Sequence, residues 1–233
     1  MDGATARSGN FVRNPRAIHT SVDRVLTLYD RRVDAWQELD EPWQASLELA
    51  WEAYLAGTIP VGSVVASADG TIVARGRNRI FDPRGVGLAG SRLAHAEVDA
   101  LSRLPVTDRY RDHVLYSTLE PCLLCTAATL VATVGRIEYA TEDRFGGACN
   151  GAIDTAHWRR SAPEIAPPLG GWPGRLSAAL QSAFWQAHPE HRRSAEIVQM
   201  FGEEAGRAGA QVLELDGIPA RLDEALPRLL DCL

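Results

Sequence analysis

The segment TLEPCLLC at residues 118–125 decides the fold of this chain. The β-branched and apolar residues from His113 to Thr118 predict a strand, and Pro121 predicts that a helix begins directly after it. Cys122 and Cys125 would then share one face of the first helical turn, where unpaired N–H groups and the helix dipole favour thiolates. Upstream, the tripeptide His95-Ala96-Glu97 stands at the start of another predicted helix.

These two short motifs together predict a metal site. His95, Cys122 and Cys125 form a three-ligand set for zinc, which leaves a fourth position for water, as in catalytic sites. Glu97 is a poor fourth ligand because only two positions separate it from His95. It can instead accept a proton from the bound water, whose pKa zinc lowers to about 7. The alternatives are a redox Cys-x-x-Cys pair or two ordinary buried cysteines, and for Glu97 a solvated acid at a helix start.

The remaining hydrophobic pattern predicts an α/β fold, in which strands alternate with helices after a leading hairpin. The hairpin is the clearest element, because two β-branched runs flank Asp69-Gly70. The expected strands are 61–66, 71–74, 113–118 and 136–140, with at most a short one at 164–166 in the Gly- and Pro-rich segment 143–171. The expected helices are 41–56, 94–104, 121–134 and 173–187.

The chain divides into three parts by this reading. Residues 1–40 form a polar, Arg-rich N-terminal extension with a short helix at 21–29, and residues 41–188 form the α/β domain. Residues 189–233 form a mostly helical C-terminal extension, rich in Ala and Arg, whose role the sequence does not show.

The composition of the chain excludes several classes of protein and of catalytic chemistry. The chain has 233 residues, 45% of them hydrophobic, and its net charge of −6 excludes a uniformly basic nucleic-acid protein but not a local basic patch. It contains no lysine, which excludes Schiff-base and P-loop lysine chemistry. Four cysteines are too few for a disulfide scaffold. No apolar run is long enough to span a membrane and no secretory signal is expected, so the sequence predicts a cytoplasmic protein.

The pairing of His-x-Glu with Pro-Cys-x-x-Cys is that of zinc nucleobase deaminases. The chain resembles the cytidine-deaminase-like superfamily, and within it the branch of bacterial tRNA adenosine deaminases, guanine deaminases and nucleoside deaminases. The segments that carry the resemblance are IPVGSV at 59–64, RNR at 77–79, HAEV at 95–98 and TLEPCLLC at 118–125. Weaker similarity runs through 135–137, Asp143 and the turn at 146–148.

The resemblance implies a three-layer α/β/α fold with a five-stranded mixed sheet, Zn²⁺ between two helix N-termini, and a homodimer. It also implies that Asn78 hydrogen-bonds the substrate base, and the alternative is a turn residue that closes a strand. Ala96 and Asp143 match positions at the substrate pocket. His95 distinguishes the chain from tetrameric cytidine deaminases, which use Cys there, and the Cys-x-x-Cys spacing distinguishes it from the riboflavin-pathway deaminase.

The chain differs from the tRNA enzymes of this family at three places that bear on the choice of substrate. The loop between Asn78 and His95 is longer than expected for the tRNA enzymes, Phe145 replaces a residue that tends to be basic in them, and the C-terminal extension is acidic. We therefore predict a free nucleobase or nucleoside as substrate, with RNA disfavoured. Editing of an adenosine in tRNA remains the alternative because four arginines, Arg77, Arg79, Arg84 and Arg92, lie near the site. A non-catalytic zinc module is a weaker alternative, since Glu97 is present.

Overall fold

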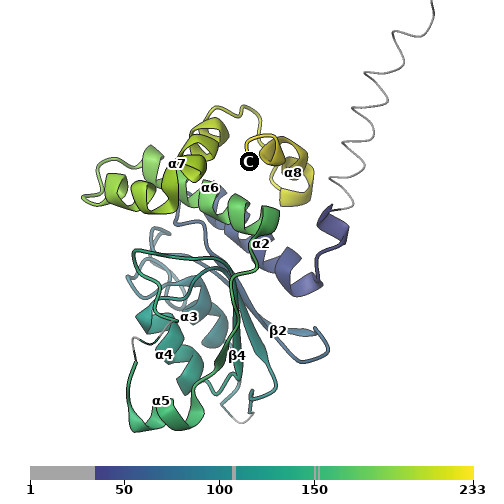
Figure 1. The fold of residues 1–233 in the computed structure, drawn as a ribbon, viewed down its shortest axis with the longest axis vertical. Coiled ribbons are helices and arrows are strands. Elements are labelled where there is room, and N and C mark those ends of the chain that lie inside the picture. Colours follow the sequence, from purple (N-terminus) through teal and green to yellow (C-terminus); the bar gives the residue numbers. More distant parts are fainter. Residues whose placement is uncertain (1–34, 107–108, 150, 152) are drawn as a thin grey trace, which may run out of the picture.

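A five-stranded mixed sheet forms the centre of the molecule (Figure 1). The computed structural model describes residues 35–106, 109–149, 151 and 153–233, so the short helix predicted at 21–29 lies outside the described residues. The strand order is β2-β1-β3-β4-β5, and β1 runs antiparallel to β2 and β3 while β3, β4 and β5 are parallel. The strands are β1 (Gly62–Ala66), β2 (Ile72–Arg77), β3 (Val114–Leu119), β4 (Arg136–Thr141) and β5 (Glu164–Ile165).

Helices cover both faces of this sheet, which confirms the predicted three layers (Figure 1). Helices α2 (Glu41–Leu55) and α6 (Gly171–Ala187) pack on one face, and α3 (Ala96–Leu101) and α4 (Leu123–Val131) lie on the other. Glycines allow this close packing. A Cβ atom at Gly62 would lie 2.0 Å from a backbone oxygen of α2, and one at Gly76 would lie 2.3 Å from a backbone oxygen of α3.

Two predicted helices, 94–104 and 121–134, are shorter in the structure. Helix α4 begins at Leu123, because Cys122 is extended (φ −71°, ψ 175°) and forms an antiparallel bridge with Gly147. Helix α3 spans only Ala96–Leu101, with His95 as its N-cap residue. The segment 143–171, predicted to hold at most a short strand, also contains α5 (Ala156–Ser161). The hydroxyl of Thr155 accepts the backbone N–H of Trp158 and caps this exposed helix.

The C-terminal extension is helical, as predicted, and it belongs to the hydrophobic core. Helices α7 (Ser194–Leu213) and α8 (Leu222–Leu230) pack with α2 and α6. Their apolar side chains share one buried cluster with Leu47 and Trp51 of α2. Polar contacts join the same elements, because the indole of Trp51 donates to the Pro219 carbonyl (3.1 Å) and the Glu48 carboxylate accepts the backbone N–H of Leu222 at the start of α8 (3.0 Å).

Candidate active site

The fold brings the three predicted zinc ligands together. His95 Nδ1 lies 3.6 Å from Cys122 Sγ and 3.5 Å from Cys125 Sγ, and the two sulfur atoms lie 3.5 Å apart. With ordinary Zn–S and Zn–N bond lengths, ligand atoms of a tetrahedral zinc site are separated by about 3.5–3.8 Å. The donor set therefore fits zinc. Among the described residues, no other group of three His, Cys, Asp or Glu side chains is placed to hold a metal ion.

Local structure explains why the ligands converge. His95 and Cys122 are the N-cap residues of α3 and α4, and Cys125 lies in the first turn of α4. The Pro121 carbonyl accepts the backbone N–H of Ala148 (3.0 Å) and the Thr126 hydroxyl (3.1 Å), which ties the start of α4 to the loop after β4. The N-termini of α3 and α4 thus meet at the carboxyl end of the central strand β3.

Hydrogen bonds among His95, Cys122 and Cys125 shift the pKa values of all three side chains. The hydrogen bond between the two thiols, with further help from His95, lowers the pKa of Cys122 to about 4. The same hydrogen bond raises the pKa of Cys125 well above its ordinary value, and hydrogen bonding to Cys122 raises the pKa of His95. The lowered pKa of Cys122 favours its thiolate, which is the form that binds metals.

Glu97 lies beside the ligand set. Its Oε1 accepts the hydroxyl of Ser117 (3.1 Å), its Oε2 lies 3.3 Å from Cys125 Sγ, and only 4% of the residue is exposed. Burial raises the pKa of its carboxyl group. The alternative of a solvated acid at a helix start is thus wrong. A buried carboxylate with one oxygen held by Ser117 is suited to accept and deliver a proton within the cavity that it lines.

A cavity of about 340 Å³ opens above the ligand set. Asn78 and Asp143 line it together with His95, Glu97 and Cys122. Its other wall comes from the C-terminal half of the chain, with Gln181 and Trp185 of α6 and Ile197 and Phe201 of α7. Each pair is spaced four residues apart, so each helix presents one face to the cavity.

The structure shows the turn-closing role of Asn78, and its contact to the substrate base stays a prediction. Its Oδ1 accepts the Thr58 hydroxyl (2.9 Å) and the backbone N–H of Ile80 (3.1 Å), which closes the turn after β2. Only the Ser182 hydroxyl is sealed off without a partner among the buried side-chain polar atoms of the described residues. The Asn78 amide NH₂, which makes no bond to another described residue, therefore opens onto the cavity as a hydrogen-bond donor.

Of the other two predicted substrate contacts, Asp143 lines the cavity and Ala96 does not. Asp143 lines the cavity, where burial raises its pKa, and its Oδ1 accepts the backbone N–H groups of Phe145 and Gly146 (2.9 and 3.0 Å). Ala96 is fully buried and its side chain is not part of the cavity lining, so a backbone contact from Ala96 to substrate stays a prediction.

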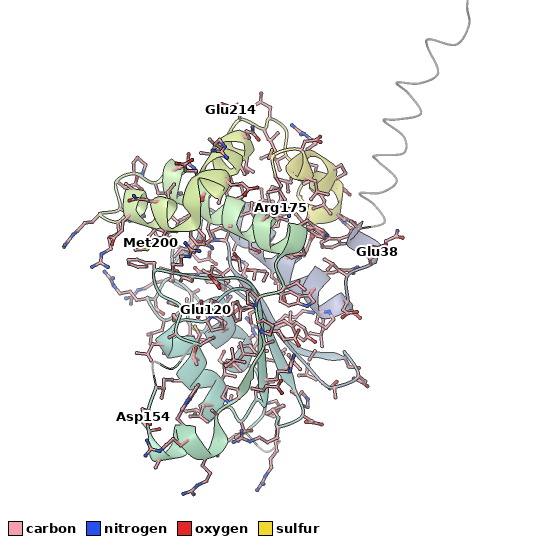
Figure 2. The ribbon with its side chains drawn as sticks, viewed as in Figure 1. Glu38, Glu120, Asp154, Arg175, Met200 and Glu214 are labelled. Carbon is pink, nitrogen blue, oxygen red and sulfur yellow. The ribbon has the colours of Figure 1, made fainter. Side chains whose placement is uncertain are left out.

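Sequence reasoning missed several residues of this site. Glu120 accepts the backbone N–H groups of Asp143 and Cys149 (both 3.2 Å) and so holds the loop that carries Asp143. In Figure 2, Glu120 lies at the end of the strands nearest α7, on which Met200 is labelled. The four wall residues of α6 and α7 were also missed. The four-residue spacing within each helix is the only sequence signal that could have suggested that each pair shares a helix face.

Comparison with known proteins agrees with this geometry. Residues 37–141 match the family model of the cytidine and deoxycytidylate deaminase zinc-binding region. A tRNA-specific adenosine deaminase of Agrobacterium fabrum is 35% identical over 120 residues, which cover 46% of this chain and 70% of that protein. A cytosine deaminase of Candida albicans is 34% identical over 107 residues, which cover 45% of this chain and 67% of that protein.

A third relative, a tRNA(Ile)-lysidine synthase of Deinococcus radiodurans, is 38% identical over 118 residues. The match covers 48% of this chain but 19% of that protein, so the chain spans about a fifth of its length. The chain belongs to the cytidine-deaminase-like superfamily, with zinc as its cofactor and His95, Cys122 and Cys125 as the group placed to hold it. The relatives are named for a free base in one case and for tRNA in others, so membership leaves the substrate open.

Proposed function

We propose that this chain is a hydrolytic deaminase that acts on a free nucleobase or nucleoside. The observation that carries the proposal is the roof of the cavity, because Ile197 and Phe201 of α7 line it opposite the zinc ligands. The cavity volume of about 340 Å³ lies at the lower end of the range of about 300–1,000 Å³ for small-molecule pockets.

Helix α7 is broken at Gly202 (φ 90°, ψ 169°), and its first segment carries Ile197 and Phe201. At the start of this segment, the Ser194 hydroxyl donates to the His188 carbonyl (2.6 Å). Beyond the break, a Cβ atom at Gly209 would lie 2.6 Å from the backbone nitrogen of Ala183, so the second segment and α6 touch backbone to backbone. The guanidinium of Arg193 lies over the Phe145 ring, 5.2 Å from its centroid, which adds a cation–π contact between the start of α7 and the loop after β4. Helix α7 therefore restricts the approach of a large substrate.

Charge near the cavity also favours a small substrate. Arg77 and Arg79 both pair with the Asp82 carboxylate, at 2.9 and 3.0 Å, so this one negative charge offsets half of the positive charge of two of the four arginines that favoured RNA. A polyanion needs several phosphate contacts from basic side chains. The acidic net charge and these internal ion pairs support a neutral base or nucleoside instead.

The reaction assigns a role to each group. Bound zinc supplies an acidified water at neutral pH. Glu97 accepts a proton from the attacking water and delivers protons to a ring nitrogen and to the departing amino group. The Asn78 amide donates a hydrogen bond to an acceptor on the base, and Asp143 contacts the substrate from the loop after β4. Water adds to the amino-bearing ring carbon, the C–N bond breaks, ammonia leaves and a carbonyl group remains.

Ammonia release tests this function directly. Cytosine, adenine, guanine and their nucleosides should be compared with a tRNA anticodon stem-loop at physiological salt, with the Glu97→Gln variant as control for contaminating activity. We expect turnover of at least one base or nucleoside by the zinc-loaded protein and none by the control. Salt-sensitive deamination of the stem-loop alone would overturn the proposal and favour the tRNA adenosine alternative, which the Agrobacterium relative's name suggests.

The homodimer implied by the resemblance stays a prediction, as does the cytoplasmic location. Helix α4 offers a surface for the dimer, because Leu123, Leu124 and Val131 are 54%, 38% and 73% exposed. Light scattering of wild type and a Val131→Glu variant tests this arrangement, and a wild-type monomer would contradict it.

None of the helices described is both long and apolar enough to cross a membrane.

A further inference from the structure

Gln181 offers an oriented hydrogen-bond acceptor to the cavity. The residue is 2% exposed and lines the cavity from α6. Its Nε2 donates to the Pro60 carbonyl (3.1 Å), which fixes which end of the amide is which. No described residue donates to its Oε1, and this atom is not sealed off in the interior, so it opens onto the cavity.

Asn78 is the complementary partner of this acceptor. Its oxygen is occupied by Thr58 and Ile80, and its NH₂ group is free, whereas Gln181 has its NH₂ group occupied and its oxygen free. Both amides are anchored on the short segment from Thr58 to Pro60. The cavity lining thus carries a fixed donor and a fixed acceptor, both anchored on one segment.

A free nucleobase carries the matching pair of groups. In a free pyrimidine or purine, the ring nitrogen that would bear the sugar carries an N–H, and a hydrogen-bond acceptor lies next to it. We propose that Gln181 selects the free base over the nucleoside by accepting a hydrogen bond from this N–H while Asn78 donates to the neighbouring acceptor. This inference rests on the proposed deaminase function and narrows its substrate class.

The position of Gln181 in the fold supports this assignment. The zinc ligands lie on α3 and α4, on one face of the sheet, whereas Gln181 lies on α6, which packs on the other face. In cytosine and adenine, the sugar-bearing nitrogen lies across the ring system from the amino-bearing carbon. Either base, with its amino group pointing at the zinc ligands, therefore turns its N–H edge toward α6.

A nucleoside cannot make this contact. The sugar replaces the hydrogen, so the buried Oε1 loses its donor, and an unsatisfied buried acceptor costs binding. The cost corresponds to about 10- to 100-fold in kcat/KM. The same loss applies to a base that carries only a methyl group on that nitrogen, which separates the missing hydrogen bond from exclusion of the sugar by size.

The experiment compares three forms of whichever base is deaminated: the free base, its derivative methylated at the sugar-bearing nitrogen, and its nucleoside. Values of kcat/KM are measured for wild type, for Gln181→Met and for Ser177→Ala. Ser177 is a matched control, because it is buried in the same helix and its hydroxyl bonds the Pro173 carbonyl within that helix. Gln181→Met keeps an unbranched side chain of similar length and removes the acceptor.

We expect wild type and Ser177→Ala to prefer the free base over the methylated base by about 10- to 100-fold. Gln181→Met should lower kcat/KM for the free base and leave that for the methylated base nearly unchanged, so the preference disappears. A purely structural role of Gln181 would lower both values together and keep their ratio, which would overturn the inference. Equal wild-type activity on base and nucleoside would also overturn it. No activity on any of the three forms of any base would refute the proposed function itself, and the inference with it.

Discussion

A methyl group added to Gly76 should damage the zinc site from outside it. Gly76 lies in β2, and a Cβ atom there would lie 2.3 Å from the Ala96 carbonyl oxygen and 2.4 Å from the Ala100 nitrogen. These are backbone atoms of α3, so no side-chain rotation can relieve the contact. An ordinary van der Waals separation of about 3.5 Å requires the start of α3 to retreat by about 1 Å.

The retreat moves the residues that α3 carries. His95 caps this helix and Glu97 lies in its first turn, so both shift relative to Cys122 and Cys125, which belong to α4. Overpacking of this kind costs about 1–3 kcal/mol of folding free energy. For a protein of this size that corresponds to a decrease in melting temperature of about 2–4 °C per kcal/mol. A misplacement of about 1 Å can lower turnover about 100-fold.

Gly62→Ala is the matched control for Gly76→Ala. Its Cβ atom would lie 2.0 Å from the Ser46 oxygen and 2.5 Å from the Ala50 nitrogen, in α2 on the opposite face of the sheet. We expect both variants to lose stability in denaturant titrations, and only Gly76→Ala to release zinc more readily to a chelator. Equal retention of zinc by both folded variants, or equal loss, would refute the reasoning.

Further predictions follow from single contacts. Purified wild type should contain one zinc ion per chain, and Cys125→Ser should lose it in metal analysis, whereas a variant that kept full zinc would contradict the ligand assignment. Glu97→Gln should keep zinc and lose about 100- to 10,000-fold of turnover, and near-normal turnover would remove its proton-transfer role. Leu226→Ala should destabilise the protein by about 2–5 kcal/mol in denaturant unfolding, because Leu226 is 1% exposed in the shared core. Asp82→Asn frees two arginines near the cavity, so affinity for stem-loop RNA and its salt dependence should rise; unchanged binding would show that these arginines cannot reach RNA.

The sequence was sufficient for those parts of the site that depend on residue chemistry. Only a few residue types bind zinc, so His95, Cys122 and Cys125 were recognisable by type and spacing, and Asp69-Gly70 marked its hairpin. The start of α4 was misplaced because Cys122 pairs with Gly147, a partner that local propensity does not show. Gln181 was missed for a related reason, since its role depends on how α6 packs against the 58–61 segment.

The burial of α2 by α8 has a consequence for the order of events during synthesis. Trp51 is fully buried, and its indole bonds a carbonyl 168 residues later in the chain. The strands and the zinc ligands lie between residues 62 and 165, so they leave the ribosome while one face of α2 has no partner. Contacts over such sequence separations form late, and apolar surface left exposed in the meantime is prone to aggregate. A nascent chain stopped before α8 would therefore carry a metal centre beneath an unfinished core, and a chaperone or rapid translation through α8 would protect it.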